Sequence, residues 1–307
     1  MKTTRPSTFV AILSAAACAA LMSACAGAPA GTPGPATGPA AGTTPGATRF
    51  AYRVPSNPDG LYHIEDSLFV GVSTPVGDME VMTTTQLSMR LRFGRDPGGI
   101  GVVGTVMGFN AVSANSRAGI RTADADDIAG PCSLVLSPGG HVEVATMPVL
   151  DTELADLSPF PGIAFEIFPR LPAYPVGPGD SWVDTVSWYV VDEVTASTTN
   201  TIYRYTLVGD TVLGDRTLLK FDVTGEVSKE TVQGEEDEQS TQEMTGTITG
   251  FVLWDTEFGL PAYVESHREM EGTNSVPGAG TIRMTISGPV RITAVFQPRE
   301  RRRIGGG

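Results

Sequence analysis

A strict alternation of apolar and polar residues is the feature that most constrains the fold of this 307-residue chain. Between Met79 and Phe93 one set of alternate positions is mainly apolar and the other is mainly polar, and the same pattern returns between Ile282 and Phe296. Alternate residues of a strand point to opposite faces, so each segment predicts a long strand with one buried face. Gly288-Pro289 interrupts the second segment without a change of phase, which predicts a bend or bulge at a sheet edge.

Further strands are expected wherever β-forming residues lie between Gly, Pro and Asp turns. These segments are 100–109, 133–146, 181–191, 198–208, 217–232, 243–254 and 260–271. Short connections predict antiparallel pairing, with hairpin turns expected at Val208-Gly209-Asp210-Thr211 and Val232-Gln233-Gly234, and the acidic residues 235–238 at the tip of the second. The predicted fold class is therefore mainly β, with long antiparallel strands in a curved sheet or half-barrel.

One segment has helical spacing instead. Its apolar residues recur every three or four positions, at Phe160, Ile163, Ala164, Ile167, Phe168 and Leu171. We expect Ser158 to cap this short connecting helix and Pro169 to end it. Two interpretations of its apolar stripe stay open: a buried core helix, or a lid over the concave face of the sheet. In the second, Phe160, Ile163, Ile167 and Phe168 would face a hydrophobic ligand.

A weak internal repeat suggests two similar β lobes. Residues 130–145 and 249–265 both read as strand, glycine-containing turn and strand. The expected β domain of residues 49–298 then divides into lobes 49–157 and 177–298, with the helix in the join 158–176, and one continuous curved sheet could hold both. Residues 299–307 form a tail with Arg299, Arg301, Arg302 and Arg303 followed by Ile304 and three glycines, for which a frayed terminus is expected.

The N-terminus has the layout of an export signal. Lys2 and Arg5 precede an apolar run of 16 residues from Phe9 to Ala24, and small residues then surround Cys25. That run is shorter than the roughly 20 residues that cross a bilayer as a helix. Residues 26–48 are all Ala, Gly, Pro or Thr, which predicts a disordered tether spanning about 25–30 Å.

The segment Leu21-Met22-Ser23-Ala24-Cys25-Ala26-Gly27 resembles the lipobox of bacterial lipoproteins, although Met22 stands where that family prefers leucine. The resemblance implies that residues 1–24 are a cleaved signal peptide and that Cys25 carries the lipid, palmitate among its acyl chains. The membrane is then a partner through this lipid. In a host with two membranes, Ala26 in place of Asp resembles an outer-membrane sorting signal, which implies an anchor facing the periplasm. In a host with one membrane the anchor would lie in the cell membrane.

Composition and motifs exclude several function classes. A formal charge of −13 argues against nucleic acid as a partner. The three histidines, His63, His141 and His267, lack metal-ligand spacing, and the chain has no Cys-x-x-Cys pair, Gly-x-Ser-x-Gly elbow or Gly-x-x-x-x-Gly-Lys loop. We therefore predict no metal, no cofactor, no catalytic residue and no enzymatic activity. The acidic loop with Asp124, Asp126 and Asp127 is expected to be solvated, and Cys132 is expected to be a packed thiol.

The join carries a second resemblance. Leu171-Pro172-Ala173-Tyr174-Pro175-Val176-Gly177-Pro178-Gly179-Asp180-Ser181-Trp182 resembles the Leu-Pro-x-x-Pro-Val-x-x-Gly-Asp-Ser-Trp segment of an uncharacterised family of bacterial envelope lipoproteins. This family implies an envelope location and a β architecture. At the level of fold, long strands around a helix are also similar to the half-barrel of periplasmic lipoprotein carriers, and a fold alone does not define a function.

Two functional hypotheses follow. The first is a non-enzymatic binding module, tethered to the membrane, for a lipid or other hydrophobic ligand on the concave face. The alternative is a structural or assembly lipoprotein that presents sheet edges and loops to other envelope proteins. The shape of the space between helix and sheet discriminates them, because an open apolar cavity favours ligand binding and a filled core favours assembly.

Overall fold

The structure is a computed structural model that describes residues 47–74, 77–191, 195–234, 239–278 and 280–296. The predicted signal peptide, Cys25, the tether up to residue 46, the acidic residues 235–238 and the basic tail lie outside the described residues. The described chain begins at the end of the tether, where Thr48 forms an isolated antiparallel bridge with Val176 of the join. The start of the described chain is therefore attached to the segment before β9.

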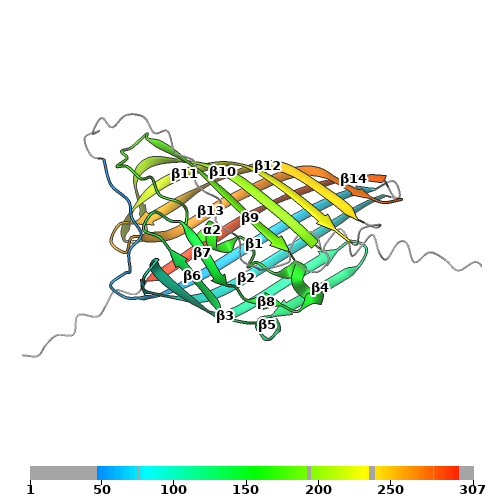
Figure 1. The fold of residues 1–307 in the computed structure, drawn as a ribbon, viewed down its shortest axis with the longest axis horizontal. Helices are drawn as coiled ribbons and strands as arrows, with labels where there is room; N and C mark the ends of the chain where they lie inside the picture. Colours follow the sequence, from blue (N-terminus) through cyan, green and yellow to red (C-terminus); the bar gives the residue numbers. More distant parts are fainter. Residues whose placement is uncertain (1–46, 75–76, 192–194, 235–238, 279, 297–307) are drawn as a thin grey trace, which may run out of the picture.

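One antiparallel sheet of 12 strands contains most of the described chain (Figure 1). Its strands are β1 (Asp59–Thr74), β2 (Gly77–Asp96), β3 (Gly99–Asn115), β4 (Gly119–Asp124), β6 (Cys132–Leu136), β7 (Val142–Thr146), β9 (Ser181–Val191), β10 (Thr195–Leu213), β11 (Arg216–Gln233), β12 (Ser240–Asp255), β13 (Leu260–Val276) and β14 (Gly280–Phe296). Their order is β7-β6-β3-β2-β1-β14-β13-β12-β11-β10-β9, and β4 pairs with β3. The short strands β5 (Ile128–Ala129) and β8 (Val149–Leu150) form a separate pair.

The sheet confirms the predicted fold class. Along β2 the buried residues alternate with exposed or half-buried ones from Met79 to Phe93, as the period of two predicts. From one edge the sheet runs through β7, β6, β3 and β2 to β1, and from the other edge it runs through β9, β10, β11, β12 and β13 to β14, which pairs with β1. This pairing of the first long strand with the last makes one continuous curved sheet, which curls into a half-barrel around the short helix α2 (Figure 1).

Two local predictions about strands are wrong. Pro289 lies in β14, which is a central strand between β1 and β13, and not at an edge. The fold tolerates this proline because pairing with β1 lapses at Gly288 and Pro289, while the β13 side stays in register. The expected hairpin at residues 208–211 is instead part of β10, with a bulge between Leu207 and Gly209, and the chain turns later at Gly214-Asp215.

The helix is shorter than predicted. α2 spans Ile163–Ile167, and its N-cap is Gly162 with a φ of 80°, not Ser158. Ser158 instead ends the 3₁₀ helix η2 (Thr152–Leu157). Two prolines and the left-handed glycine between residues 159 and 162 keep the chain from entering a helix earlier, so the apolar spacing extends beyond the helix it predicted.

The inner face of the half-barrel has two parts. We call the part packed around α2 and the join the helix half; its core contains most of the aromatic side chains. The far half continues along the same strands and holds a second, aliphatic cluster, formed by Leu68, Val70, Val72, Met79, Val81, Met244, Ile282, Met284 and Ile286. These two parts of one wall differ in composition, and the difference locates the candidate site.

Candidate functional site

The predicted lid residues lie in the helix half. Phe160, Ile163, Ile167 and Phe168 are at most 5% exposed and belong to the aromatic core. Phe160 stacks on Phe109 with ring centroids 6.4 Å apart, and Phe168 meets Phe93 edge-on at 6.3 Å. Protein side chains therefore pack around the apolar stripe of this segment, and the structure brings these four residues together within a core.

The inner wall of the far half is divided by chemistry. Strand register places side chains in rows that cross the sheet, and neighbours in a row are in contact distance. On β1, β2 and β14 most inward residues of the far half are aliphatic or thioether side chains, grouped in the second cluster, and the buried Thr83 and Thr85 of β2 are exceptions. On β10 to β13 the inward positions include many hydroxyl and amide side chains, namely Thr195, Ser197, Thr199, Thr201, Thr231, Gln242 and Asn274, all of them buried.

Four of these residues form a continuous row that we call the amide belt: Asn274, Gln242, Thr231 and Ser197. They are consecutive register partners on β13, β12, β11 and β10. Ser197 Oγ and Thr231 Oγ1 share a hydrogen bond of 2.9 Å. The row continues on β14 to Ile282, the register partner of Asn274, so the polar and aliphatic parts of the wall meet there.

Acceptor atoms of the belt lack hydrogen bonds within the described part of the chain. Gln242 donates through Nε2 to Met244 Sδ at 3.2 Å and Met284 Sδ at 3.4 Å, while its Oε1 accepts none. Asn274 Oδ1 also accepts none, and neither does Oγ1 of Thr199 in the adjacent row. Exposures of 1% for Gln242, 4% for Asn274 and 7% for Thr199 exclude bulk water as their partner. A buried acceptor without a donor costs about 1–3 kcal/mol, so the belt is a site suited to a group that donates hydrogen bonds.

A charged cluster lies between the two halves. Arg268 of β13 reaches Glu166 of α2, with Nη2 3.2 Å from Oε1, and Asp66 of β1, with Nη2 3.9 Å from Oδ2. Although all three side chains are on the inner side of the sheet, they retain 25–27% of their accessible surface, so a space that water can enter borders them. Burial, with a smaller effect of Asp66, raises the pKa of Glu166 against the opposing effect of Arg268.

Lys229 adds an amine to the polar side of the far half. In the register row next to the amide belt, Lys229 of β11 lies between Met244 of β12 and Thr199 of β10. Burial lowers the pKa of Lys229 to about 8, and the positive charge of Arg268 acts in the same direction. Part of the Lys229 population is therefore uncharged in mildly basic solution.

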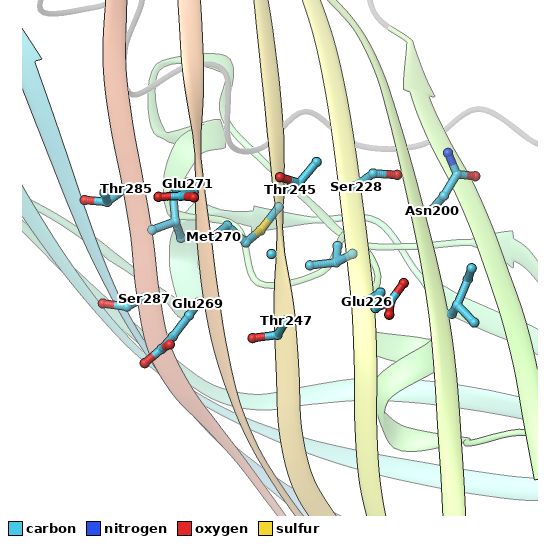
Figure 2. Close-up of a pocket in the computed structure, with 14 residues that line it drawn as sticks. Asn200, Glu226, Ser228, Thr245, Thr247, Glu269, Met270, Glu271, Thr285 and Ser287 are labelled. Atoms are coloured by element: carbon cyan, nitrogen blue, oxygen red, sulfur yellow. The ribbon is translucent and has the colours of Figure 1, made fainter.

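The outer face of the same strands carries a groove with a volume of about 770 Å³. Figure 2 shows its labelled side chains on β10 to β14. They form two register rows, Asn200-Ser228-Thr245-Glu271-Thr285 and Ile202-Glu226-Thr247-Glu269-Ser287. Three glutamates and no lysine or arginine of the described chain line the groove, together with Ile202, Val227, Met270 and Ile286, so its surface combines acidic and apolar groups.

The backbones of β12 and β13 approach each other closely at two glycines. A Cβ on Gly246 would collide with the carbonyl oxygen of Glu269, and one on Gly272 would collide with that of Glu243. Both contacts are with backbone, which cannot rotate away. Glycine at these positions therefore permits the curvature that places the amide belt inside and the groove outside.

Sequence reasoning missed both the belt and the groove. Alternation assigns residues to faces, but the rows depend on which strands pair and in which register. One signal was present on β12, where Gln242 stands in a phase that holds only apolar residues and glycine from Met244 to Trp254. Buried polar residues are more informative than exposed apolar ones, so this break in the pattern could have indicated the belt.

The histidines, the cysteine and the acidic loop noted in the sequence occupy separate surroundings. His63 contacts Ser88, His141 contacts Arg170 and His267 lies near Glu269. Cys132 is buried with its thiol 3.8 Å from Met147 Sδ. The acidic loop forms a capping box at the 3₁₀ turn η1 (Ala125–Asp127), in which the side chains of Asp124 and Asp127 each accept a hydrogen bond from the backbone of the other.

Neither a metal cluster nor a membrane-spanning helix occurs among the described residues. They contain no group of three or more His, Cys, Asp or Glu side chains that could hold a metal ion. Within the same ranges, no helix has the length and hydropathy needed to span a membrane.

Comparison with known proteins gives only distant structural matches. No protein-family model and no curated protein matches this sequence. Among crystal structures, Pseudomonas aeruginosa OccK7 (OpdD) matches with 8% identity and a TM-score of 0.23, covering 77% of this chain and 99% of that chain. The outer membrane protein opdK from the same organism matches with 7% identity and a TM-score of 0.21, covering 77% and 99%. Similarity at this level carries no argument about function.

Proposed function

We propose that this protein is a lipid-anchored bacterial envelope lipoprotein whose half-barrel is a non-enzymatic binding module for an amphiphile. The observation that carries the proposal is the divided inner wall of the far half, where an aliphatic cluster adjoins a belt of buried polar side chains with unsatisfied acceptors. The proposed site lies here and not at Phe160, Ile163, Ile167 and Phe168, since those four side chains pack in the aromatic core.

A wall with an apolar part and a polar part suits a ligand with a hydrocarbon chain and a polar head group. Each buried CH₂ group contributes about 0.8 kcal/mol, so a chain of about ten carbons would contribute roughly 8 kcal/mol before the costs of immobilisation. The polar end must then find hydrogen-bond partners, because an unpaired polar group in an apolar site opposes binding. Ile282 and Met284 lie next to Asn274 and Gln242, so both requirements can be met by one ligand.

The anchor is the second part of the proposal. A lipid on Cys25 would keep the domain at a membrane, where amphiphiles are concentrated. Labelled palmitate should enter the full-length protein in cells and should not enter the Cys25→Ser variant. Equal labelling of the two proteins would contradict the lipid anchor without affecting the proposed ligand site.

Binding is tested with the purified full-length protein. Solvent extraction followed by mass spectrometry should recover a co-purified amphiphile, and a fluorescent fatty acid should bind and be displaced by it. Met284→Gln places a polar group of similar volume in the aliphatic cluster and should weaken binding at least tenfold. Met82→Gln is the matched control, since Met82 is exposed on the outer face. Absence of any bound or binding amphiphile would reject the proposed function.

Two observations favour the alternative, an assembly lipoprotein. The space between α2 and the sheet is filled by the aromatic core, and one edge of the sheet is unprotected. β9 ends the sheet, pairs only with β10 there, and contains neither lysine nor proline, the residues that commonly protect an edge strand. Val183 and Val191 on this strand are exposed. A partner could add a strand at this edge. A photo-crosslinker at residue 183 should then capture one defined envelope protein in cells, and Val183→Lys should prevent that assembly without altering amphiphile binding.

A further inference from the structure

We infer that the amide belt selects amphiphiles whose uncharged head group carries hydroxyl groups, such as a monoacylglycerol. This inference rests on the proposed function, and it adds the chemical class of the ligand. It is drawn from three features of the far half: the type of the unsatisfied atoms, the absence of charge on the belt, and the position of the aliphatic cluster.

The unsatisfied atoms require a donor. Gln242 Oε1 and Asn274 Oδ1 are carbonyl oxygens, which can only accept hydrogen bonds. The Gln242 amide nitrogen already donates to two thioether sulfurs. A hydroxyl group satisfies such an oxygen and retains its own lone pairs for a neighbouring donor, whereas an ether, an ester or a bare hydrocarbon end leaves the acceptor unpaired.

The surroundings of the belt disfavour an ionic head group, an ammonium group because of nearby positive charge and an anionic group because it lacks donors and loses solvation. None of the belt residues Asn274, Gln242, Thr231 and Ser197 carries a formal charge, and all are buried. An ammonium head would lie near Lys229 on the adjacent row, with the positive charge of Arg268 further along the wall. A carboxylate or phosphate head has no proton to donate to the two carbonyl oxygens when ionised, and it would lose solvation on entering a buried site. A neutral hydroxyl group avoids both penalties.

The spacing of the belt fits a vicinal diol. Asn274 and Gln242 are directly opposite each other on adjacent strands, which places their Cβ atoms about 5 Å apart. Hydrogen bonds of about 2.7–2.8 Å from two hydroxyls on neighbouring carbons can reach both side-chain oxygens. Glycerol and sugar head groups supply such pairs.

The aliphatic cluster gives the hydrocarbon chain a direction. Ile282 continues the belt row on β14, and Met284 lies in the next row with Val72 and Met79 as successive neighbours on β1 and β2. All four side chains are buried in the same cluster. A chain attached to a head group at Asn274 and Gln242 would therefore run across β14 towards β2.

Two matched ligands test the inference on the full-length protein. Monomyristin and its 2,3-dimethoxy analogue share the acyl chain, but only monomyristin donates hydrogen bonds. We expect monomyristin to bind at least tenfold more tightly, as measured by displacement of a fluorescent fatty acid. Hydrophobicity alone would favour the dimethoxy analogue, so the expected order cannot arise from non-specific partitioning. Myristate and tetradecyltrimethylammonium are the anionic and cationic comparison ligands, and both should bind more weakly than monomyristin.

Variants locate the selectivity. Gln242→Leu combined with Asn274→Leu should reduce the preference for monomyristin to below threefold while leaving affinity for the dimethoxy analogue within threefold. The matched control changes Gln86 and Asn110 to leucine, since these two exposed residues are also register partners, on the outer face of β2 and β3. The control should retain the full preference.

The outcomes separate the two proposals. Equal binding of both matched ligands, or tighter binding of either charged comparison ligand, would overturn the inference and leave the amphiphile-binding function standing. Binding of none of the four ligands would overturn both. The comparison of ligands uses the unaltered protein, so it decides the inference even if the double variant does not fold.

Discussion

The helix half and the far half share one sheet and the same alternation of residues, yet they are completed in different ways. In the helix half, aromatic rings from the strands, the join and the segment before β1 contact one another. Phe221, for example, meets Phe50 at 5.1 Å and Trp182 at 5.3 Å between ring centroids. In the far half, aliphatic side chains lie beside buried polar atoms that lack partners within the described chain. The hydroxyl group of Tyr62 in the aromatic core also lacks a partner, but only in the far half do two such acceptors, on Gln242 and Asn274, lie directly opposite each other in the described chain. Dense aromatic packing is typical of a core that stabilises the fold, while neighbouring buried acceptors without donors call for a different explanation.

The first test of this comparison removes an aromatic ring from the helix half. Phe221 is fully buried, so Phe221→Ala should lower the free energy of unfolding by about 3–5 kcal/mol through lost burial and the cavity left behind. Phe69→Ala, at an exposed ring on the outer face of β1, should lower it by less than about 1 kcal/mol. Urea unfolding measures both. Equal losses would mean that the helix half is not the stabilising core.

The second test concerns the curvature of the wall. Gly246→Ala directs a methyl group against the backbone of β13 and should cost about 1–3 kcal/mol in urea unfolding. The control is Gly108→Ala on β3, where a Cβ meets nothing within 4 Å. That substitution should be neutral or stabilising by about 0.4–1 kcal/mol, because alanine restricts the unfolded chain. Tolerance of alanine at Gly246 would contradict the close approach of β12 and β13.

The third test uses pH to probe the polar side of the far half. Burial lowers the pKa of Lys229 to about 8, below the value of 10.5 for an ordinary lysine. Between these two values the unfolded chain binds more protons than the folded one, so stability should rise with pH. Between pH 8 and 9.5 the expected rise is about 1.5 kcal/mol.

Variants assign that rise to one amine. Lys229→Met should remove the increase between pH 8 and 9.5, because the ionisable group is gone. Lys220→Met should preserve it, since Lys220 lies on the outer face and pairs with Asp222 at 2.8 Å. Urea unfolding at each pH measures the free energy of unfolding of both variants. If this free energy still rises between pH 8 and 9.5 in Lys229→Met, another group is responsible.

The smallest effect is expected in the amide belt. Gln242→Leu removes an acceptor without a partner together with two weak hydrogen bonds to sulfur, so the free energy of unfolding should change by no more than about 1 kcal/mol, in either direction. Loss of several kcal/mol would show that the belt serves stability, and the contrast between the two halves would then fail. Thermal unfolding with and without monomyristin distinguishes the two roles, because the ligand should stabilise the unaltered protein more than the Gln242→Leu variant.

Much of the fold was predictable, and the candidate site was not. β9 spans Ser181–Val191, the same bounds that its β-forming residues and flanking Asp180 predict, and β11 and β12 differ from their predicted segments by only a few residues. The lid prediction described the apolar spacing of Phe160 to Phe168 correctly, but spacing alone does not reveal whether a ligand or the protein itself covers an apolar stripe. The lipid on Cys25 stays a prediction from the N-terminal sequence.

The sequence by itself determined the alternating strands and the predominantly antiparallel class, because these follow from interactions between residues that are near one another in the chain. Only the tertiary structure decided that β1 pairs with β14, that Pro289 stands in a central strand, and that Gln242 lies opposite Asn274. Each of these depends on a register between separate strands, and a shift of one residue would turn every inward side chain outward. The physical reason is that a period of two defines the faces of a strand, whereas a binding site is defined by which strands lie beside it.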